Sequence, residues 1–326
     1  METRILGKSG LKASVIGLGC WQLGGDFGSE GVSNTNAILS AADESGITFW
    51  DTADVYGAGR SEQKIGEWAD NNVKKRTIVT KVGRDGSLYP DQYTENNIRK
   101  SIENSLRRLK VDSIDLIQLH CVPPNELKSD RIWDLLDKFR SQGLIKHYGA
   151  SVETIEEGLS CIDRPGLTSL QIIFNLFRQD AKQSLLKKAA QADVGIIARL
   201  PLASGLLSGK FTQNTEFSEQ DHRNYNKDGD AFNVGETFSG LRYTKALELV
   251  DKLRTFTTEH PSLPQFALRW ILDHPEVTTV IAGASSADQV AQNAMASNLK
   301  PLSAELHEQL YDFYMNFVKE NVRGNI

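Results

Sequence analysis

The sequence predicts an α/β fold in which eight parallel strands close into a (β/α)8 TIM barrel, with an N-terminal extension and a C-terminal helix. Two observations predict it. Short apolar runs alternate with longer amphipathic segments, and the runs that qualify as strands number eight. Strands that are covered on both faces are expected to be short, continuous and rich in apolar or β-branched residues, as these are.

The strand candidates come in this order: 15–19, 47–51, 77–81, 114–120, 145–151, 169–174, 194–199 and 278–283. Helix candidates occupy the connections, at 34–45, 61–70, 94–109, 129–142, 153–161, 181–192 and 286–298. Two more precede the eighth strand, at 240–259 and 264–273, and a last one follows the barrel at 303–320. In the helix candidate 94–109, apolar residues recur at the spacing of one helical face, as in Ile98, Ile102 and Leu109.

No low-complexity linker divides the chain, so we expect one barrel domain over residues 1–326. The segment 211–240 differs from the rest because it is polar, rich in Asp and Asn, and without periodicity. We predict that it forms a long loop after the seventh strand, on the face where barrel enzymes place functional loops.

The bulk composition limits the partners and the compartment. A net charge of −5 weighs against nucleic acid or an anionic membrane as the main partner. No apolar run approaches the roughly 18 residues that span a bilayer, and the first residues lack the apolar core of a secretory signal. The three cysteines, Cys20, Cys121 and Cys161, form no CxxC pair and no zinc pattern. We therefore expect a cytoplasmic protein that acts on a small molecule.

Polar residues stand where predicted strands end. Asp51, Lys81 and His120 close strands two, three and four, and Tyr56 lies in the loop after strand two. Active groups of such barrels sit at the C-terminal ends of the strands. Each residue alone has an ordinary structural explanation, such as a helix cap for an aspartate, but their convergence at one barrel mouth favours a catalytic site.

These four residue types suit the reduction of a carbonyl group. A tyrosine hydroxyl, with a reference pKa of about 10, needs help to exchange its proton near neutrality. A neighbouring lysine ammonium lowers that pKa, and an aspartate keeps the lysine charged and in place. A histidine donor orients the carbonyl and shares the developing charge. We predict that Tyr56 is the proton donor.

Several segments resemble signatures of the aldo-keto reductase superfamily, in the branch that holds bacterial reductases and potassium-channel beta subunits. They include DTADVYGAGRSE (51–62), TKVG (80–83), LIQLH (116–120), PLASGLLSGK (201–210) and IAGASSADQVAQN (281–293), and the opening RILGKSGLKASVIGLGCWQLG. The resemblance implies a (β/α)8 barrel, the cofactor NADP(H), and interconversion of carbonyl and alcohol through a tyrosine acid. It assigns the four catalytic positions to Asp51, Tyr56, Lys81 and His120.

The same resemblance places a dinucleotide along the barrel mouth. Its nicotinamide half is expected to contact Gly19, Cys20, Trp21, Asp51, Ser151, Gln171 and Arg199. The pyrophosphate is expected at Leu200, Pro201, Leu202, Ser204 and Lys210, and the adenosine end at Gly283, Ser285, Gln289 and Asn293.

Two departures from the family pattern affect these contacts. Val152 follows Ser151 where the family usually has asparagine, and Arg199 stands where it often has an aromatic residue. A guanidinium can stack on the nicotinamide, but its charge should disfavour the oxidised, cationic ring. The segment 281–293 contains no Arg or Lys to hold a 2′-phosphate. We therefore expect NADP(H) to be preferred moderately, with NAD(H) possible.

The same residues favour neither a Rossmann fold nor a metal-dependent hydrolase. The run GLGCWQLGG lacks the third glycine of a dinucleotide-binding fingerprint, since that position is Gln22. A metal-dependent hydrolase is disfavoured because Lys81 would have to serve as a ligand, so no metal is expected. Two alternatives stay open: an NADPH-binding regulatory subunit with little turnover, and a polyol or sugar dehydrogenase that uses NAD.

Substrate identity and oligomeric state cannot be read from the sequence. We expect the substrate pocket to be shaped by Trp21, Phe27 and the loops near 122–128 and 211–240.

Overall fold

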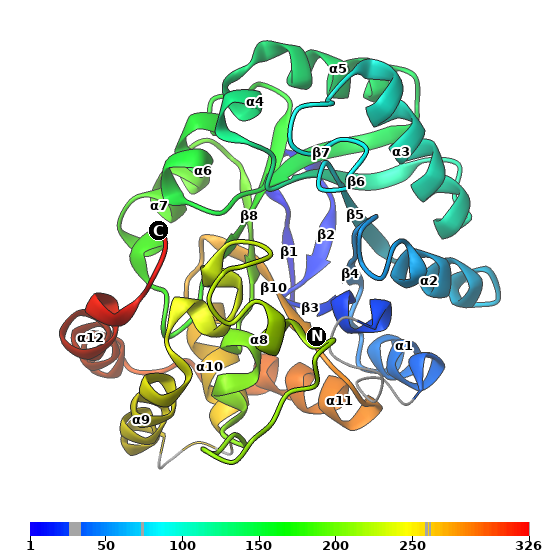
Figure 1. Cartoon of the computed structure of the whole chain (residues 1–326). Coiled ribbons are helices and arrows are strands. Elements are labelled where there is room, and N and C mark those ends of the chain that lie inside the picture. Colours follow the sequence, from blue (N-terminus) through cyan, green and yellow to red (C-terminus); the bar gives the residue numbers. More distant parts are fainter. Residues whose placement is uncertain (26–33, 73–74, 258–259, 261, 326) are drawn as a thin grey trace.

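The computed structural model describes residues 1–25, 34–72, 75–257, 260 and 262–325, and its centre is a closed barrel of eight parallel strands (Figure 1). This confirms the predicted fold class. Two predicted strands, 114–120 and 145–151, match the observed ones residue for residue. The barrel strands are β3 (Ile16–Gly19), β4 (Phe49–Asp51), β5 (Thr77–Val82), β6 (Ile114–His120), β7 (Ile145–Ser151), β8 (Leu167–Ile173), β9 (Gly195–Arg199) and β10 (Val277–Gly283).

Helices surround the barrel, and each predicted helical region contains one. The prediction 181–192 divides into a 3₁₀ turn and α7, because Ser184 between them leaves the helical conformation. Among the described residues, no helix has both the length and the apolar character needed to cross a membrane. The helices are α1 (Thr35–Glu44), α2 (Arg60–Asp70), α3 (Glu95–Leu109), α4 (Pro124–Lys128), α5 (Asp130–Ser141), α6 (Ile155–Cys161), α7 (Leu185–Gln191), α8 (His222–Tyr225), α9 (Tyr243–Leu253), α10 (Leu263–Leu272), α11 (Ala287–Met295) and α12 (Ala304–Phe313).

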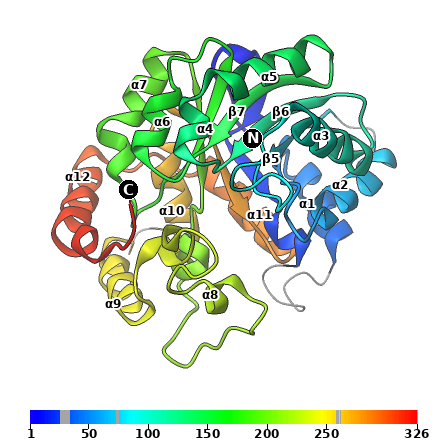
Figure 2. The same ribbon diagram turned by 45° about the horizontal axis from the view of Figure 1, so that its top comes forward.

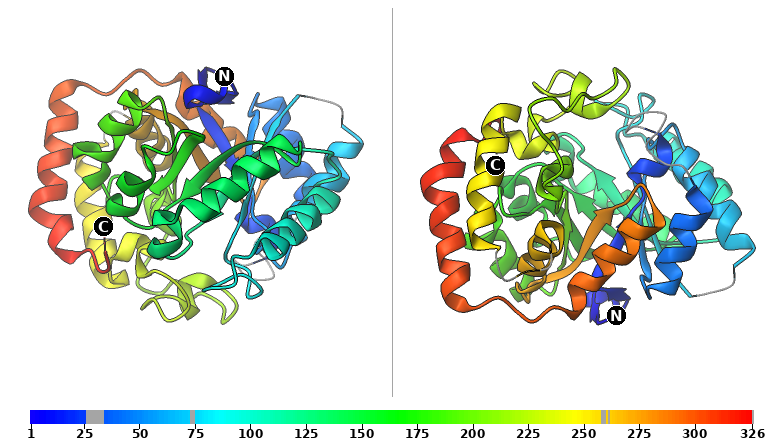
Figure 3. Two further views of the ribbon diagram at one scale, coloured as in Figure 1. Left: turned by 90° about the horizontal axis from the view of Figure 1, so that it is seen from above. Right: turned by 90° about the horizontal axis from the view of Figure 1, so that it is seen from below.

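The N-terminal extension is a hairpin of two antiparallel strands, β1 (Thr3–Ile5) and β2 (Lys12–Ser14). Leu6, in its connection, is fully buried in an apolar cluster with side chains from inside the barrel. The Arg4 guanidinium donates to the Val277 carbonyl at 2.6 Å. The hairpin therefore closes the N-terminal end of the barrel, opposite the face that carries α8 (Figure 3).

The segment 211–240, predicted as a long loop, contains more regular structure than expected. It includes α8 and two 3₁₀ turns, Val234–Glu236 and Phe238–Gly240. The C-terminal tail returns to this segment after α12, which lies beside α9 (Figure 2). The backbone N–H and Nε of Arg323 donate to the Gly240 carbonyl at 3.2 and 2.9 Å. A segment without periodicity is thus held in place by contacts with distant parts of the chain.

Candidate active site

The predicted catalytic residues meet at the C-terminal face of the barrel. Asp51 ends β4, Lys81 is the fifth residue of β5, and His120 ends β6. These strands are hydrogen-bonded neighbours in parallel register, so their ends reach the same edge. Tyr56 lies between β4 and α2. Asp51, Tyr56 and His120 line a cavity of about 1060 Å³.

The Lys81 ammonium group connects three elements of this site. Its Nζ donates to Asp51 Oδ1 at 2.5 Å, to the Thr52 carbonyl at 2.8 Å and to Tyr56 Oη at 3.1 Å. The Lys81 and Asp51 side chains are 1% and 2% exposed. An ammonium has three N–H bonds, so every donor of this buried lysine is used.

The second carboxylate oxygen of Asp51 is held by two glutamines inside the barrel. Gln171 Nε2 donates to Oδ2 at 2.8 Å and Gln118 Nε2 donates to it at 3.3 Å. Gln118 was not predicted as a site residue. The signal was present, because side chains alternate along a strand and Gln118 stands two residues before His120, on the same face.

The acidity of Tyr56 differs from the sequence-based expectation. Burial raises the pKa of the phenol to about 12, Lys81 lowers it in part, and Asp51 raises it again. The predicted lowering of this pKa by Lys81 is present, but the loss of water around the ring, which the sequence-based expectation did not include, outweighs it. Tyr56 is protonated at neutral pH, which is the form that can donate.

His120 is a neutral imidazole in this setting. Burial lowers its pKa well below the usual value, and the charges of Lys81, Arg84 and Arg199 lower it further. Its ring stands edge-on to Tyr56, with 5.9 Å between ring centroids. Within the described part of the chain, its buried Nδ1 has no hydrogen-bond partner. A neutral imidazole keeps one N–H, so His120 can donate to a ligand without carrying charge.

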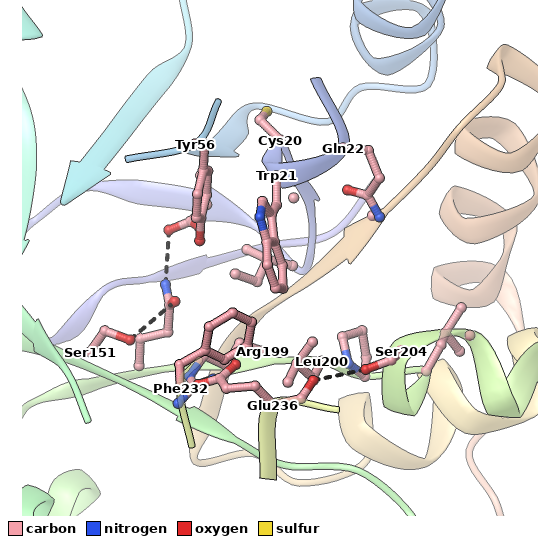
Figure 4. Close-up of a pocket in the computed structure, with 18 of the residues that line it drawn as sticks. Cys20, Trp21, Gln22, Tyr56, Ser151, Arg199, Leu200, Ser204, Phe232 and Glu236 are labelled. Atoms are coloured by element: carbon pink, nitrogen blue, oxygen red, sulfur yellow. Dashed lines mark hydrogen bonds and ion pairs between the residues drawn. The ribbon is translucent and has the colours of Figure 1, made fainter. Parts of the chain in front are cut away.

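Trp21 forms an aromatic wall beside Tyr56 (Figure 4). The two rings are nearly parallel, with centroids 5.7 Å apart, and the ring of His222 in α8 lies 4.6 Å from that of Trp21. Phe232, also from the segment 211–240, lies 6.2 Å away. The sequence did not single out His222 or Phe232. Phe27, expected to shape the pocket, lies outside the described residues.

Every residue predicted to contact a dinucleotide lines this one cavity. Gly19 and Gly283 pair across β3 and β10, at the point where the two strands end. Lys210 is exposed at the surface. The lining residues that were predicted are Gly19, Cys20, Trp21, Asp51, Ser151, Gln171, Arg199, Leu200, Pro201, Leu202, Ser204, Lys210, Gly283, Ser285, Gln289 and Asn293.

The end of the cavity near α11 is lined by polar residues. Ser285 donates from its backbone N–H and its hydroxyl to Gln289 Oε1, at 2.8 and 3.0 Å. Asn293 Nδ2 donates to the Gly283 carbonyl at 3.3 Å. Asp288 lies in the first turn of α11. The acidic residue opposes the attraction of a helix N-terminus for phosphate.

Two ion pairs that no sequence signal indicated line the cavity. The Arg199 guanidinium pairs with Glu236, and Arg84 Nη2 pairs with Glu153 Oε1 at 3.0 Å. The sequence placed the positive charge of Arg199 in the site but indicated no counter-ion, and the structure supplies one in Glu236. Glu236 lies in a segment without periodicity, so nothing in the sequence pairs it with a residue at the end of β9.

A comparison with known families agrees with this geometry. Residues 15–314 match the model described as the aldo/keto reductase family. This chain belongs to the aldo/keto reductase family. The matched residues run from the start of the barrel to the end of α12, so the family assignment covers both the strands that carry Asp51, Lys81 and His120 and the segment 211–240.

Curated members of the family include bacterial and plant relatives. The uncharacterized oxidoreductase YqkF of Bacillus subtilis is 30% identical over 94% of each chain. A probable voltage-gated potassium channel subunit beta of rice, Oryza sativa subsp. japonica, is 28% identical over 93% of each chain. The predicted resemblance to bacterial reductases and channel beta subunits is confirmed.

Solved aldo-keto reductases have the same fold. The glycerol dehydrogenase AKR11B4 from Gluconobacter oxydans is 28% identical, with a TM-score of 0.79 over 99% of this chain and 98% of that one. For the aldo-keto reductase AKR11C1 from Bacillus halodurans, the TM-score is 0.78 with the holo form and 0.71 with the apo form, each over 96% of both chains. The backbone of this chain is thus closer to the holo form of that protein.

Proposed function

We propose that this aldo/keto reductase family protein interconverts aldehydes or ketones with alcohols, using NADP(H) as cofactor and Tyr56 as proton donor. One observation carries the proposal. The Lys81 ammonium contacts both Asp51 and the Tyr56 hydroxyl, and these two partners line a cavity large enough for a cofactor and a small substrate.

The residues that line the cavity fit a nicotinamide dinucleotide. Two buried polar atoms at the barrel mouth, Arg199 Nε and His120 Nδ1, have no hydrogen-bond partner among the described residues. Ser151 and Gln171 supply polar groups for the carboxamide, and Lys210 supplies a cation for the pyrophosphate. Such a cofactor supplies a hydride to the carbonyl carbon.

Side chains of this protein supply the proton and stabilise the charge that develops during reduction. The substrate oxygen gains negative charge during reduction and takes the proton of Tyr56. Lys81 stabilises the resulting phenolate, and Asp51 keeps the ammonium in place through the 2.5 Å contact. The neutral His120 donates a hydrogen bond that orients the carbonyl. Alcohol oxidation uses the same groups in reverse, with Tyr56 as base.

The preference for NADP(H) over NAD(H) rests on the end of the cavity near α11. The backbone N–H groups at the start of this helix carry partial positive charge, which favours a 2′-phosphate. Asp288 opposes this attraction, and Ser285 already donates its hydroxyl proton to Gln289. We propose that NADP(H) is preferred about ten-fold. The attraction of the helix N-terminus and the repulsion by Asp288 are each worth on the order of 1 kcal/mol, so the net preference is modest.

The test is a survey of turnover. Aldehydes, ketones, sugars and polyols are assayed with NADPH or NADP⁺ and with NADH or NAD⁺, while absorbance of the reduced nicotinamide is followed. Steady turnover of at least one simple aldehyde or polyol is expected. Tight NADPH binding with almost no turnover across the panel would favour a regulatory subunit instead, an alternative that the likeness to a channel subunit beta keeps open.

A further inference from the structure

Arg199 and Glu236 form a buried ion pair in the wall of the cavity that faces Trp21 and Tyr56 (Figure 4). Arg199 is 7% exposed, and so is Glu236. The guanidinium Nη1 contacts Glu236 Oε1, and Nη2 donates to the Val152 carbonyl at 3.0 Å. The buried Nε also has no partner in the described part of the chain.

Glu236 is held in this place by its backbone as well as by its carboxylate. Its carbonyl accepts the Ser204 hydroxyl at 2.9 Å, and the same hydroxyl accepts the Phe238 N–H at 3.2 Å. Ser204 belongs to the predicted pyrophosphate loop and has a positive φ of 56°. Replacing only the Glu236 carboxylate therefore leaves its connection to this loop intact.

Other charges around Arg199 are already compensated. Arg84 pairs with Glu153, and Asn233 Nδ2 also donates to Glu153 Oε2 at 3.0 Å. Burial raises the pKa of the nearby Cys121 thiol to about 11, so it is neutral at physiological pH. Glu236 is the carboxylate that contacts the Arg199 guanidinium, and its charge acts on Arg199 more strongly than that of Glu153 does.

We propose that Glu236 is a positioning residue that neutralises Arg199, so that the site accepts the oxidised, cationic nicotinamide nearly as well as the reduced one. This inference rests on the proposed cofactor. Because the oxidised ring is positive and the reduced ring is neutral, an uncompensated guanidinium beside the ring would repel only the oxidised form. Glu236 thereby sets the balance between the two cofactor states and the ease of alcohol oxidation.

The test measures dissociation constants of NADP⁺ and NADPH by titration calorimetry at pH 8. In Glu236→Gln, the ratio of the NADP⁺ constant to the NADPH constant should rise about ten-fold, which raises the potential of the bound couple by about 30 mV. Arg199→Met leaves the carboxylate uncompensated, so the ratio should fall instead. A merely structural role would not move the ratio in opposite directions.

Two further variants separate the explanations. In the double variant Arg199→Met with Glu236→Gln, the ratio should return to within about three-fold of the wild type, an energy of about 0.7 kcal/mol. Glu153→Gln, which removes the same charge beside Arg84, should change the ratio less than Glu236→Gln does. If Glu236→Gln and Arg199→Met both still bind NADPH and leave the ratio of the two dissociation constants unchanged, the inference is overturned while the proposed function stands. Failure of the wild-type protein to bind either dinucleotide overturns the proposed function.

Discussion

Lys81 Nζ lies 2.5 Å from Asp51 Oδ1, and neither side chain reaches solvent appreciably. The residues are thirty positions apart in the chain and meet because β4 and β5 are neighbours in the barrel. Burial disfavours the charged form of Lys81, but Asp51, together with Tyr56, outweighs that effect and raises the lysine pKa above its usual value. The ammonium is therefore permanently charged beside the Tyr56 hydroxyl.

Tyr56→Phe removes only the hydroxyl that contacts Lys81. We expect aldehyde reduction to fall by about 10²-fold or more, since the developing oxyanion loses its acid. Folding and NADPH binding should be retained, because the ring that packs on Trp21 is kept. Steady-state kinetics with a calorimetric binding control measure both, and near-normal reduction would show that another group donates the proton.

Lys81→Met keeps most of the stem and removes the charge. Lys81 lowers the pKa of Tyr56 from within a buried site, so its loss should raise that pKa above about 12. Alcohol oxidation needs the phenolate, and its rate should therefore require a higher pH than in the wild type. The measurement is the pH dependence of kcat/KM for oxidation.

A control for this variant is necessary because it leaves Asp51 buried without its cation, which commonly costs about 3–5 kcal/mol of stability. Thermal unfolding should be recorded beside Lys81→Arg, which retains the charge. A pH profile that stays unchanged in a folded Lys81→Met protein would assign Lys81 a structural role only.

The cofactor preference can be tested at the start of α11. Asp288→Asn removes a negative charge near the proposed 2′-phosphate position, so NADPH affinity should rise about two- to five-fold while NADH affinity stays constant. Ser285→Ala combined with Gln289→Ala should bring the two cofactors close to parity. Wild-type dissociation constants for NADH as low as those for NADPH would make the protein NAD-dependent.

Asp54, three residues after Asp51, allows a prediction about stability. Burial, and next the charge of Glu62, raises the pKa of the Asp54 carboxyl from 3.8 to about 7, although Ser101 donates to it at 3.0 Å. Between these two values the unfolded chain has already lost the proton that the folded protein keeps. The contribution of Asp54 to stability should therefore decrease as the pH rises from about 4 to about 7.

Asp54→Asn is a neutral replacement of similar shape that removes this dependence. It should raise the midpoint of thermal unfolding by several degrees at pH 8 and by clearly less at pH 5, where only part of the loss has occurred. Unfolding curves at the two pH values measure the difference. An equal shift at both would mean that the charge of Asp54 is not the cause.

Much of the fold and the candidate site could be predicted because the relevant signals are local. A strand covered on both faces is a short apolar run, so the barrel strands were recognisable one at a time. Parallel strands bring their C-terminal ends to one face, so Asp51, Lys81 and His120 could be placed together without coordinates. The single-domain organisation over 1–326 and the catalytic roles stay predictions.

Other features of the site were decided only by the tertiary structure. They depend on which distant segments come into contact and on how far water is excluded. The pairing of Arg199 with Glu236 and the packing of His222 on Trp21 join the segment 211–240 to strand ends that no periodicity connects to it. The net rise in the pKa of Tyr56 follows from burial, which outweighs the visible neighbour Lys81. Sequence determines which groups a protein carries, but the strength of each charge is set by how much water and which partners surround it.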